Sequence, residues 1–220
     1  MKKNMYAIID TETANGLSNP LCYDIAVIIF DKKGNEYFRK NWIVKNVWCN
    51  KKMMNTAYYA WKMPLYENIP HVLVNAYTFI TEFNQILSDY NVNYLLAYNL
   101  KFDLRSISKT VEKYTYNSSL NTDTIDFIDV WNVATDIIMN NNKYKTFCKE
   151  NGFVSECGNY KTSAEICYRY LTNEIDFDES HTAMDDCEIE MHIFLTCVNR
   201  KKKIEIGIVS NPWRKIQDRE

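Results

Sequence analysis

The order of the predicted secondary structure is the feature that most constrains the fold of this chain. Three runs of apolar, β-type residues come first, and a turn centred on Gly34 joins the second run to the third. A helical pattern, a short buried strand and a second helical pattern follow. This order predicts an α/β fold in which helices flank a mixed sheet of about five strands. The expected strands are residues 5–10, 23–31, 36–44, 94–97 and 124–130.

The rest of the chain is predicted to be helical, apart from one aromatic segment. Residues 45–70 contain several Trp and Tyr side chains without a regular period, so we expect them to be irregular. Residues 1–199 are expected to form one domain, and residues 200–220 a basic C-terminal tail. The run Arg200-Lys201-Lys202-Lys203 that opens this tail either contacts phosphates or forms a solvated helix end. The expected helices are residues 72–90, 103–114, 142–151, 162–171 and 182–198.

Composition excludes several classes of protein. The longest apolar run, residues 25–30, has six residues, whereas a membrane-spanning helix needs about 20. The apolar run behind the basic N-terminus ends at Asp10, which is too early for a secretory signal. The seven cysteines include no CxxC pair, so a disulfide scaffold and a cysteine zinc site are not expected. These features predict a cytoplasmic protein that does not enter a membrane.

The net charge of −2 excludes a strongly basic nucleic-acid binder. It does not exclude nucleic acid as a partner. Several carboxylates at one site lower the net charge, and divalent metals bound there restore a local positive potential.

A pair of carboxylates directly follows the first predicted strand. Asp10 and Glu12 are two residues apart, and such residues point to the same side of an extended chain. Both carboxylates can therefore face one point in space. Taken alone, the pair is also typical of a solvated strand end.

Two further segments place acids at the starts of predicted helices. The fourth predicted strand leads through Asn99 and Phe102 to Asp103, which is equally suited to capping the helix that follows. His181 and Asp186 open the last long helix, where acids are common in any case. Neutral histidine can accept a proton from a metal-activated water.

Together the three segments resemble the exonuclease motifs of the DEDDh family in the ribonuclease H-like superfamily. The family pattern is DxE, then NxxFD, then HxAxxD, and this chain carries Asp10/Glu12, Asn99 to Asp103, and His181 to Asp186 in that order. The resemblance covers most of residues 5–198. The same motifs are found in polymerase proofreading exonucleases and ribonuclease T. Within the family, the chain looks most like small exonucleases of bacteriophages and prophages.

One choice within the third motif depends on spacing. His181 to Asp185 is the step of a sister subclass that uses Tyr, whereas His181 to Asp186 is the step of the His subclass. Because the residue is His and Ala183 fits the HxAxxD form, we assign Asp186 to the motif and leave Asp185 as a capping or neighbouring carboxylate.

The resemblance implies a ribonuclease H-like mixed five-stranded sheet and a metal-dependent 3′–5′ exonuclease. Two Mg²⁺ or Mn²⁺ ions would be held by Asp10, Glu12, Asp103 and Asp186, and His181 would accept the proton of the attacking water. The products would be nucleoside 5′-monophosphates released from DNA or RNA 3′ ends. Alternative functions are an accessory proofreading subunit of a polymerase and a non-catalytic module that binds nucleic-acid ends. A polymerase or a second copy of the chain would be the protein partner.

Substrate contacts are the least specific part of the resemblance. It marks Thr13, Leu17, Asn99 and Phe102 as candidates for contact with the 3′-terminal nucleotide of a single strand. The loop after Glu12 departs from the family pattern at Ala14-Asn15. Four aromatic residues could stack on bases, although the burial tendency of aromatic side chains favours a place in the core for each: Tyr58, Tyr59, Trp61 and Phe102.

Overall fold

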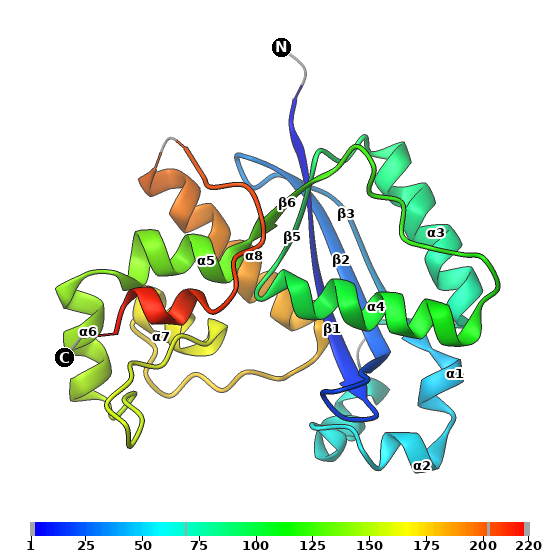
Figure 1. Ribbon diagram of the computed structural model, residues 1–220, viewed down its shortest axis with the longest axis horizontal. Helices are drawn as coiled ribbons and strands as arrows, with labels where there is room; N and C mark the ends of the chain where they lie inside the picture. The colour runs from blue at the N-terminus through cyan, green and yellow to red at the C-terminus, as the bar shows by residue number, and fades with distance from the viewer. Residues whose placement is uncertain (1–2, 69, 202, 218–220) are drawn as a thin grey trace.

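The computed structural model describes residues 3–68, 70–201 and 203–217 of the 220-residue chain. A six-stranded sheet lies at its centre, with strand order β4-β3-β2-β1-β5-β6 (Figure 1). The strands are β1 (Met5–Ala14), β2 (Leu21–Asp31), β3 (Glu36–Val44), β4 (Val72–Val74), β5 (Tyr94–Ala97) and β6 (Asp126–Asp129).

Strand directions confirm the predicted mixed sheet. The first three strands pair antiparallel, whereas β5 runs parallel to β1, and β6 runs parallel to β5. The sixth strand, β4, was not expected, because its residues were assigned to the start of a helix. The helix begins only after Asn75, whose side chain caps it by accepting from the Thr78 N–H at 2.8 Å. Residues 72–74 are therefore left to pair with the edge of β3.

Helices cover both faces of the sheet, and the alternation of side chains along β1 explains why. Ala7 and Ile9 pack into one apolar core with α3 and α4, whereas Tyr6 and Ile8 pack into another with α5 and α8 (Figure 1). The helices are α1 (Lys45–Trp48), α2 (Lys51–Met54), η1 (Ala60–Glu67), α3 (Ala76–Asp89), α4 (Leu100–Tyr114), α5 (Val130–Ala134), η2 (Thr135–Met139), α6 (Asn142–Glu150), α7 (Ala164–Thr172), α8 (Ala183–Arg200) and η3 (Pro212–Lys215). None of the helices in the described part of the chain combines the length and apolar character that crossing a bilayer requires.

Three segments differ from the sequence-based expectation. Residues 45–68, expected to be irregular, contain the short helices α1, α2 and η1. Residues 130–139 form α5 and the π-helical turn η2; residue 130 was expected to end a strand, and no element was predicted for residues 131–139. The first strand, expected to end at residue 10, continues to Ala14, because Thr13 and Ala14 still pair with β2 beyond a bulge at Glu12/Thr13.

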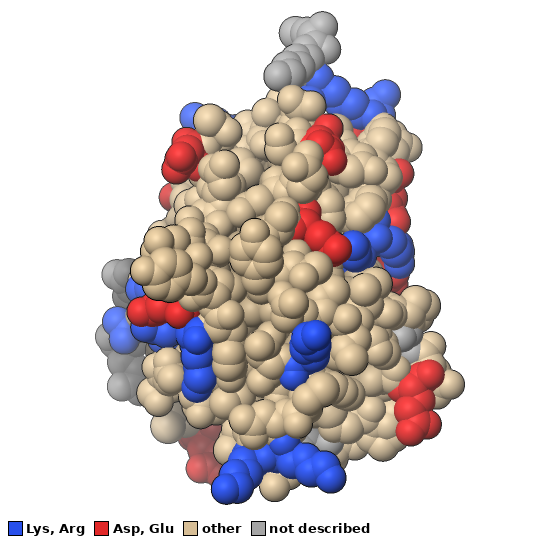
Figure 2. Space-filling view, turned by 90° about the vertical axis from the view of Figure 1, so that its right-hand side faces the viewer, with Lys and Arg blue, Asp and Glu red and all other residues tan. Residues whose placement is uncertain are grey.

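Surface charge agrees with the small net charge. On the face shown in Figure 2, Lys and Arg side chains form small separate groups with acidic and uncharged side chains between them. No broad basic patch is visible on this face.

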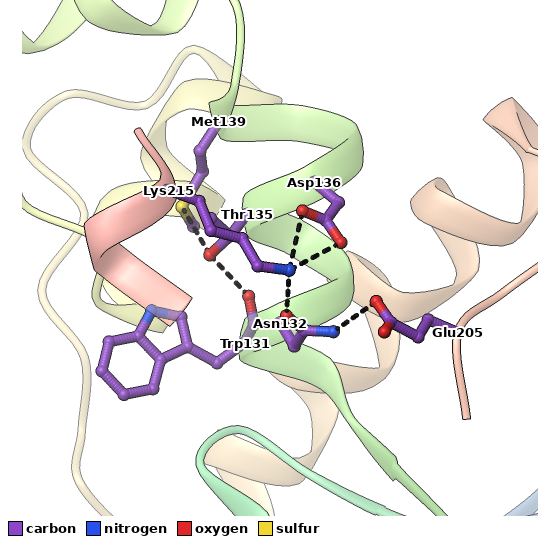
Figure 3. Close-up of polar contacts among 7 residues, drawn as sticks. All are labelled: Trp131, Asn132, Thr135, Asp136, Met139, Glu205 and Lys215. Atoms are coloured by element: carbon purple, nitrogen blue, oxygen red, sulfur yellow. Dashed lines mark hydrogen bonds and ion pairs between the residues drawn. The ribbon is translucent and has the colours of Figure 1, made fainter. Parts of the chain in front are cut away.

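The described part of the C-terminal tail packs against α5 and η2. Lys215 Nζ donates to Asn132 Oδ1 at 2.7 Å and lies 3.0 Å from both carboxylate oxygens of Asp136, while Asn132 Nδ2 donates to Glu205 at 3.0 Å (Figure 3). Ile216 is fully buried. Within the basic run, Arg200 is the last residue of α8, and Lys202 lies outside the described residues. That the domain ends at residue 199 stays a prediction.

Candidate active site

The first carboxylates of the site lie on β1. Asp10 pairs with Ala26 and Glu12 with Asp24 in an unbroken part of the β1–β2 ladder. The two acids are therefore two residues apart on one regular strand, on the same face as Tyr6 and Ile8. This is the face that α8 covers.

The third carboxylate comes from the first turn of α4. Asn99 begins this helix in the left-handed conformation, with φ +71°, so Asn99 rather than Asp103 occupies the capping position. Asp103 is only 2% exposed, and its Oδ1 accepts a hydrogen bond from Thr11 Oγ1 at 2.8 Å. This bond ties the start of α4 to β1, next to Asp10 and Glu12.

The fourth carboxylate comes from the first turn of α8. Asp186 is buried and lines the same cavity as Asp10, Glu12 and Asp103. Asp185 points elsewhere: it lines a different cavity, and its Oδ2 accepts from Ser180 Oγ at 2.5 Å. Of the two neighbouring acids, only Asp186 lines the cavity, and its assignment to the third motif stays a prediction.

His181 lies just before α8 and faces the same cavity. Its backbone has φ +53°, an uncommon conformation for a residue with a side chain. The Tyr59 ring stacks on the imidazole, with centroids 3.8 Å apart and planes inclined by 10°. His181 Nδ1 lies 3.5 Å from Glu179 Oε2.

The cavity has a volume of about 420 Å³ and is lined by residues of strands, helices and loops that lie far apart in the sequence. Of the expected substrate contacts, Thr13, Leu17 and Phe102 line it. Asn99 is not among its lining residues, and its N–H donates to Asp129 Oδ1 at 3.3 Å instead. A role for Asn99 in starting α4 therefore fits the structure better than direct contact with a nucleotide.

The four aromatic candidates differ in exposure and in whether they line the cavity. Tyr58 is 78% exposed and Trp61 is 69% exposed, so neither is a core residue. Tyr59 and Phe102 are half-buried. Tyr58, Tyr59 and Phe102 line the cavity.

Two further acids of the cavity were missed by the sequence analysis. Glu190 lies one helical turn after Asp186, is 3% exposed, and its Oε2 accepts from the Tyr98 N–H at 2.9 Å. Glu179 precedes His181 by two residues and is also buried. The four-residue spacing from Asp186 to Glu190 was a usable signal, because it places both side chains on one face of a helix.

The crowding of buried acids raises the pKa values of their carboxyls. Burial raises the pKa of Asp10 well above its ordinary range, and the charges of Asp186 and Glu190 add to this effect. Burial likewise raises the pKa of Asp186, with Glu179 next in importance. The pKa of Asp103 rises to about 8, mainly through burial.

The arrangement fits a divalent cation. Among the described residues, Asp10 Oδ2 and Asp186 Oδ1 are buried and have no hydrogen-bond partner. Ligand atoms of Glu12, His181 and Asp186 lie within 4.8 Å of one another. Carboxylate oxygens are the ligands that Mg²⁺ and Mn²⁺ prefer, and a bound cation would give these oxygens the partner that the protein does not provide.

A second groove lies along α4, beyond the mouth of the cavity. It has a volume of about 420 Å³ and is lined by Asn19, Leu21, Lys109, Glu112 and Lys113. Between this groove and the cavity, an Arg105 Nη donates to the Leu17 carbonyl at 3.0 Å, and its guanidinium lies 5.5 Å from the centre of the Phe102 ring. No Lys or Arg of the described residues lines the cavity itself, whereas Arg105, Lys109 and Lys113 follow Phe102 at four-residue steps or near them along α4.

No protein-family model matches the sequence, and no curated protein matches it. Solved structures do match. The chain is 16% identical to Escherichia coli ExoI in its zinc-bound complex with single-stranded DNA, with a TM-score of 0.59, over 92% of this chain and 42% of ExoI. A complex of E. coli exonuclease I with a dT13 oligonucleotide gives 16% identity and the same TM-score over 91% of this chain.

The second similar protein is cell-death related nuclease 4 (CRN-4). The identity is 14% and the TM-score 0.59, over 93% of this chain and 66% of CRN-4. The chain thus spans less than half of ExoI and about two thirds of CRN-4. At these identities the likeness concerns the fold, and it shows that this chain has the ribonuclease H-like fold of these nucleases.

Proposed function

We propose that this protein is a metal-dependent 3′–5′ exonuclease that removes nucleoside 5′-monophosphates from the 3′ ends of single-stranded DNA or RNA. The observation that carries the proposal is the convergence of Asp10, Glu12, Asp103, Asp186 and His181 on one cavity. These residues come from three separate segments, and two of the carboxylates keep a buried oxygen without a donor among the described residues.

The carboxylates would hold the metal. Asp10, Glu12 and Asp186 are the proposed ligands of one ion, and Asp10 with Asp103 would take part in holding a second. When bound, divalent cations stabilise the charge of a phosphodiester under attack and make a water molecule easier to deprotonate.

His181 is the proposed general base. The imidazole faces the cavity beside Glu12 and Asp186, where it can accept a proton from the attacking water. Attack at phosphorus breaks the bond to the 3′ oxygen of the preceding nucleotide, which takes up a proton as the strand end is released. The phosphate stays on the terminal nucleotide, so the product is a 5′-monophosphate.

The apolar wall of the cavity would hold the terminal nucleotide. Leu17 is 70% exposed at the mouth, and Phe102 presents a half-buried ring beside it. Stacking on an aromatic ring binds any base, so this wall favours a site without sequence preference. The remaining strand would leave along α4, where Arg105, Lys109 and Lys113 could contact its phosphates.

A degradation assay on 3′-labelled oligonucleotides tests the proposal. Single-stranded DNA, double-stranded DNA and single-stranded RNA are each incubated with Mg²⁺, Mn²⁺ or EDTA, and the released products are identified. Asp10→Ala and Asp186→Asn should abolish release, while Asp185→Asn, the neighbouring acid outside the cavity, serves as the matched control and should retain it. Full activity in EDTA, or equal activity of the Asp186 and Asp185 variants, would contradict the proposal.

A further inference from the structure

Residues 57–68, the second half of the aromatic segment 45–70, reach the candidate site at two points. At the first point, the Tyr59 ring lies flat against His181 at 3.8 Å. At the second, the buried Tyr66 hydroxyl donates to Asp24 Oδ2 at 2.6 Å. Neither contact involves an acid assigned to the metal.

Asp24 connects the second point to the start of α8. The same Oδ2 atom accepts from the Ala183 N–H at 3.0 Å, and Asn41 Nδ2 also donates to Asp24. Thr182 occupies the capping position of α8, but its side chain makes no capping hydrogen bond to the helix. Asp24 therefore supplies from β2 the acceptor that the first turn of α8 lacks locally.

Tyr59 contacts the residues just before α8, where its ring stacks on His181. His181 precedes α8, keeps about 20% of its side chain exposed and has a left-handed backbone. A partly exposed ring at such a position can rotate, and a general base works only when its acceptor nitrogen faces the attacking water. The flat stack on Tyr59 fixes the plane of the imidazole. Glu179 lies 3.5 Å from Nδ1, and a carboxylate beside Nδ1 favours a proton on that nitrogen, which would leave Nε2 as the acceptor.

We propose that Tyr59 is a positioning residue for His181, and that the bonds of Tyr66 and Ala183 to Asp24 hold the 57–68 segment against the start of α8 for this purpose. The proposal rests on the exonuclease function proposed above. It assigns Tyr59 to the imidazole rather than to a base of the substrate. The face of Tyr59 toward His181 is already covered, and Tyr58 meets Tyr59 edge-on at 4.8 Å.

Kinetics of five proteins test the proposal: wild type, Tyr59→Phe, Tyr59→Leu, His181→Ala and the double variant Tyr59→Leu/His181→Ala. Tyr59→Phe keeps the ring, so its kcat should stay within about twofold of wild type. Tyr59→Leu should lower kcat about tenfold or more with little change in KM, within the ~10²–10⁴-fold that a general base contributes. In the His181→Ala background, Tyr59→Leu should cause no further loss, because no imidazole is left to position.

Other outcomes would overturn the positioning role. A Tyr59→Leu variant that raises KM at constant kcat would show that Tyr59 binds substrate. An equal loss from Tyr59→Leu with and without His181 would show that the tyrosine acts independently. Neither result would contradict the proposed exonuclease function. In contrast, wild-type turnover by His181→Ala would defeat the general-base role and, with it, this inference.

A spectroscopic measurement keeps the test independent of activity. The ring protons of a histidine stacked on an aromatic ring resonate upfield, and the His181 signal can be assigned by its loss in His181→Ala. The signal should stay upfield in wild type and Tyr59→Phe and move downfield in Tyr59→Leu. An unshifted wild-type signal, or one that Tyr59→Leu leaves in place, would refute the stack in solution.

Discussion

Replacing Asp103 by Asn should stabilise the metal-free protein while abolishing the proposed exonuclease activity. In the folded state the Asp103 carboxyl has a pKa of about 8, compared with an ordinary value of 3.8, mainly because it is buried. At pH 7 the unfolded chain ionises this group, whereas the folded protein keeps it largely protonated. Because the pKa is higher in the folded protein, ionisation of this group costs no stability below about pH 4. The free energy of unfolding then falls as pH rises from about 4 toward 8.

The magnitude follows from the pH interval. Each unit of difference in pKa corresponds to about 1.4 kcal/mol, and about three units separate 3.8 from pH 7. The cost of Asp103 to the stability of the metal-free protein at pH 7 is thus of the order of 4 kcal/mol, and below about 1 kcal/mol at pH 4. Asparagine cannot ionise, and it keeps an oxygen that can accept from Thr11. The variant should therefore recover most of this free energy, which raises Tm by roughly 10 °C in a chain of this length.

Denaturant unfolding in EDTA at pH 5, 6, 7 and 8 measures the effect. The difference in free energy of unfolding between Asp103→Asn and wild type should increase with pH. Excess Mg²⁺ should reduce this difference, because a bound cation compensates the charge of the wild-type carboxylate. The exposed Asp123 offers the control Asp123→Asn, which should change stability by less than about 0.5 kcal/mol. A variant less stable than wild type at pH 7, or a gap independent of pH, would refute the reasoning.

Three further predictions concern activity and the binding of single strands. EDTA should stop nucleotide release, and Mg²⁺ or Mn²⁺ should restore it; release that persists in EDTA would exclude the metal scheme. The rate should rise with pH as the His181 imidazole loses its proton, and His181→Ala should lower the rate roughly 10²–10⁴-fold and lose that dependence, with metal affinity measured by calorimetry nearly unchanged. A fall in metal affinity would instead make His181 a ligand. Lys109→Gln/Lys113→Gln should reduce the salt dependence of single-strand binding by a slope of about 1.4, as expected for two lost phosphate contacts. The matched control is Lys32→Gln/Lys33→Gln, in the turn between β2 and β3 beside the start of β1, and it should leave that slope unchanged.

The parts of the fold that the sequence predicted are those in which local pattern and tertiary environment agree. β2 is buried along its whole length, so its nearly continuous apolar run could be assigned without knowing its neighbours. The acids of β1 could be placed together because the strand period alone puts Asp10 and Glu12 on one face. Asp186 could be chosen over Asp185 from spacing, and the structure places only Asp186 in the cavity.

The parts that escaped prediction depend on contacts between distant segments. β4 has two exposed residues in three, so it carries no period that distinguishes it from the helix behind it. The aromatic content of residues 45–70 indicated burial somewhere, but nothing local shows that Tyr59 meets His181 or that Tyr66 meets Asp24. Glu190 was missed for a different reason, since it lies outside the three short motifs although it shares a helical face with Asp186.

Hydrogen-bond partners, rather than burial, distinguish the roles of the buried acids around the cavity. Asp24 is completely buried, but Tyr66, Asn41 and Ala183 all donate to it, so Asp24→Ala would leave three donors without an acceptor and should destabilise the protein. Asp10 and Asp186 are buried beside other acids, and each has an oxygen without a donor among the described residues. An arrangement of this kind lowers the stability of the folded chain, and a bound cation would offset that cost. Opposite stability changes in Asp24→Ala and Asp186→Asn, measured in EDTA at pH 7, would therefore separate an acid that stabilises the folded chain from one whose burial requires a bound cation.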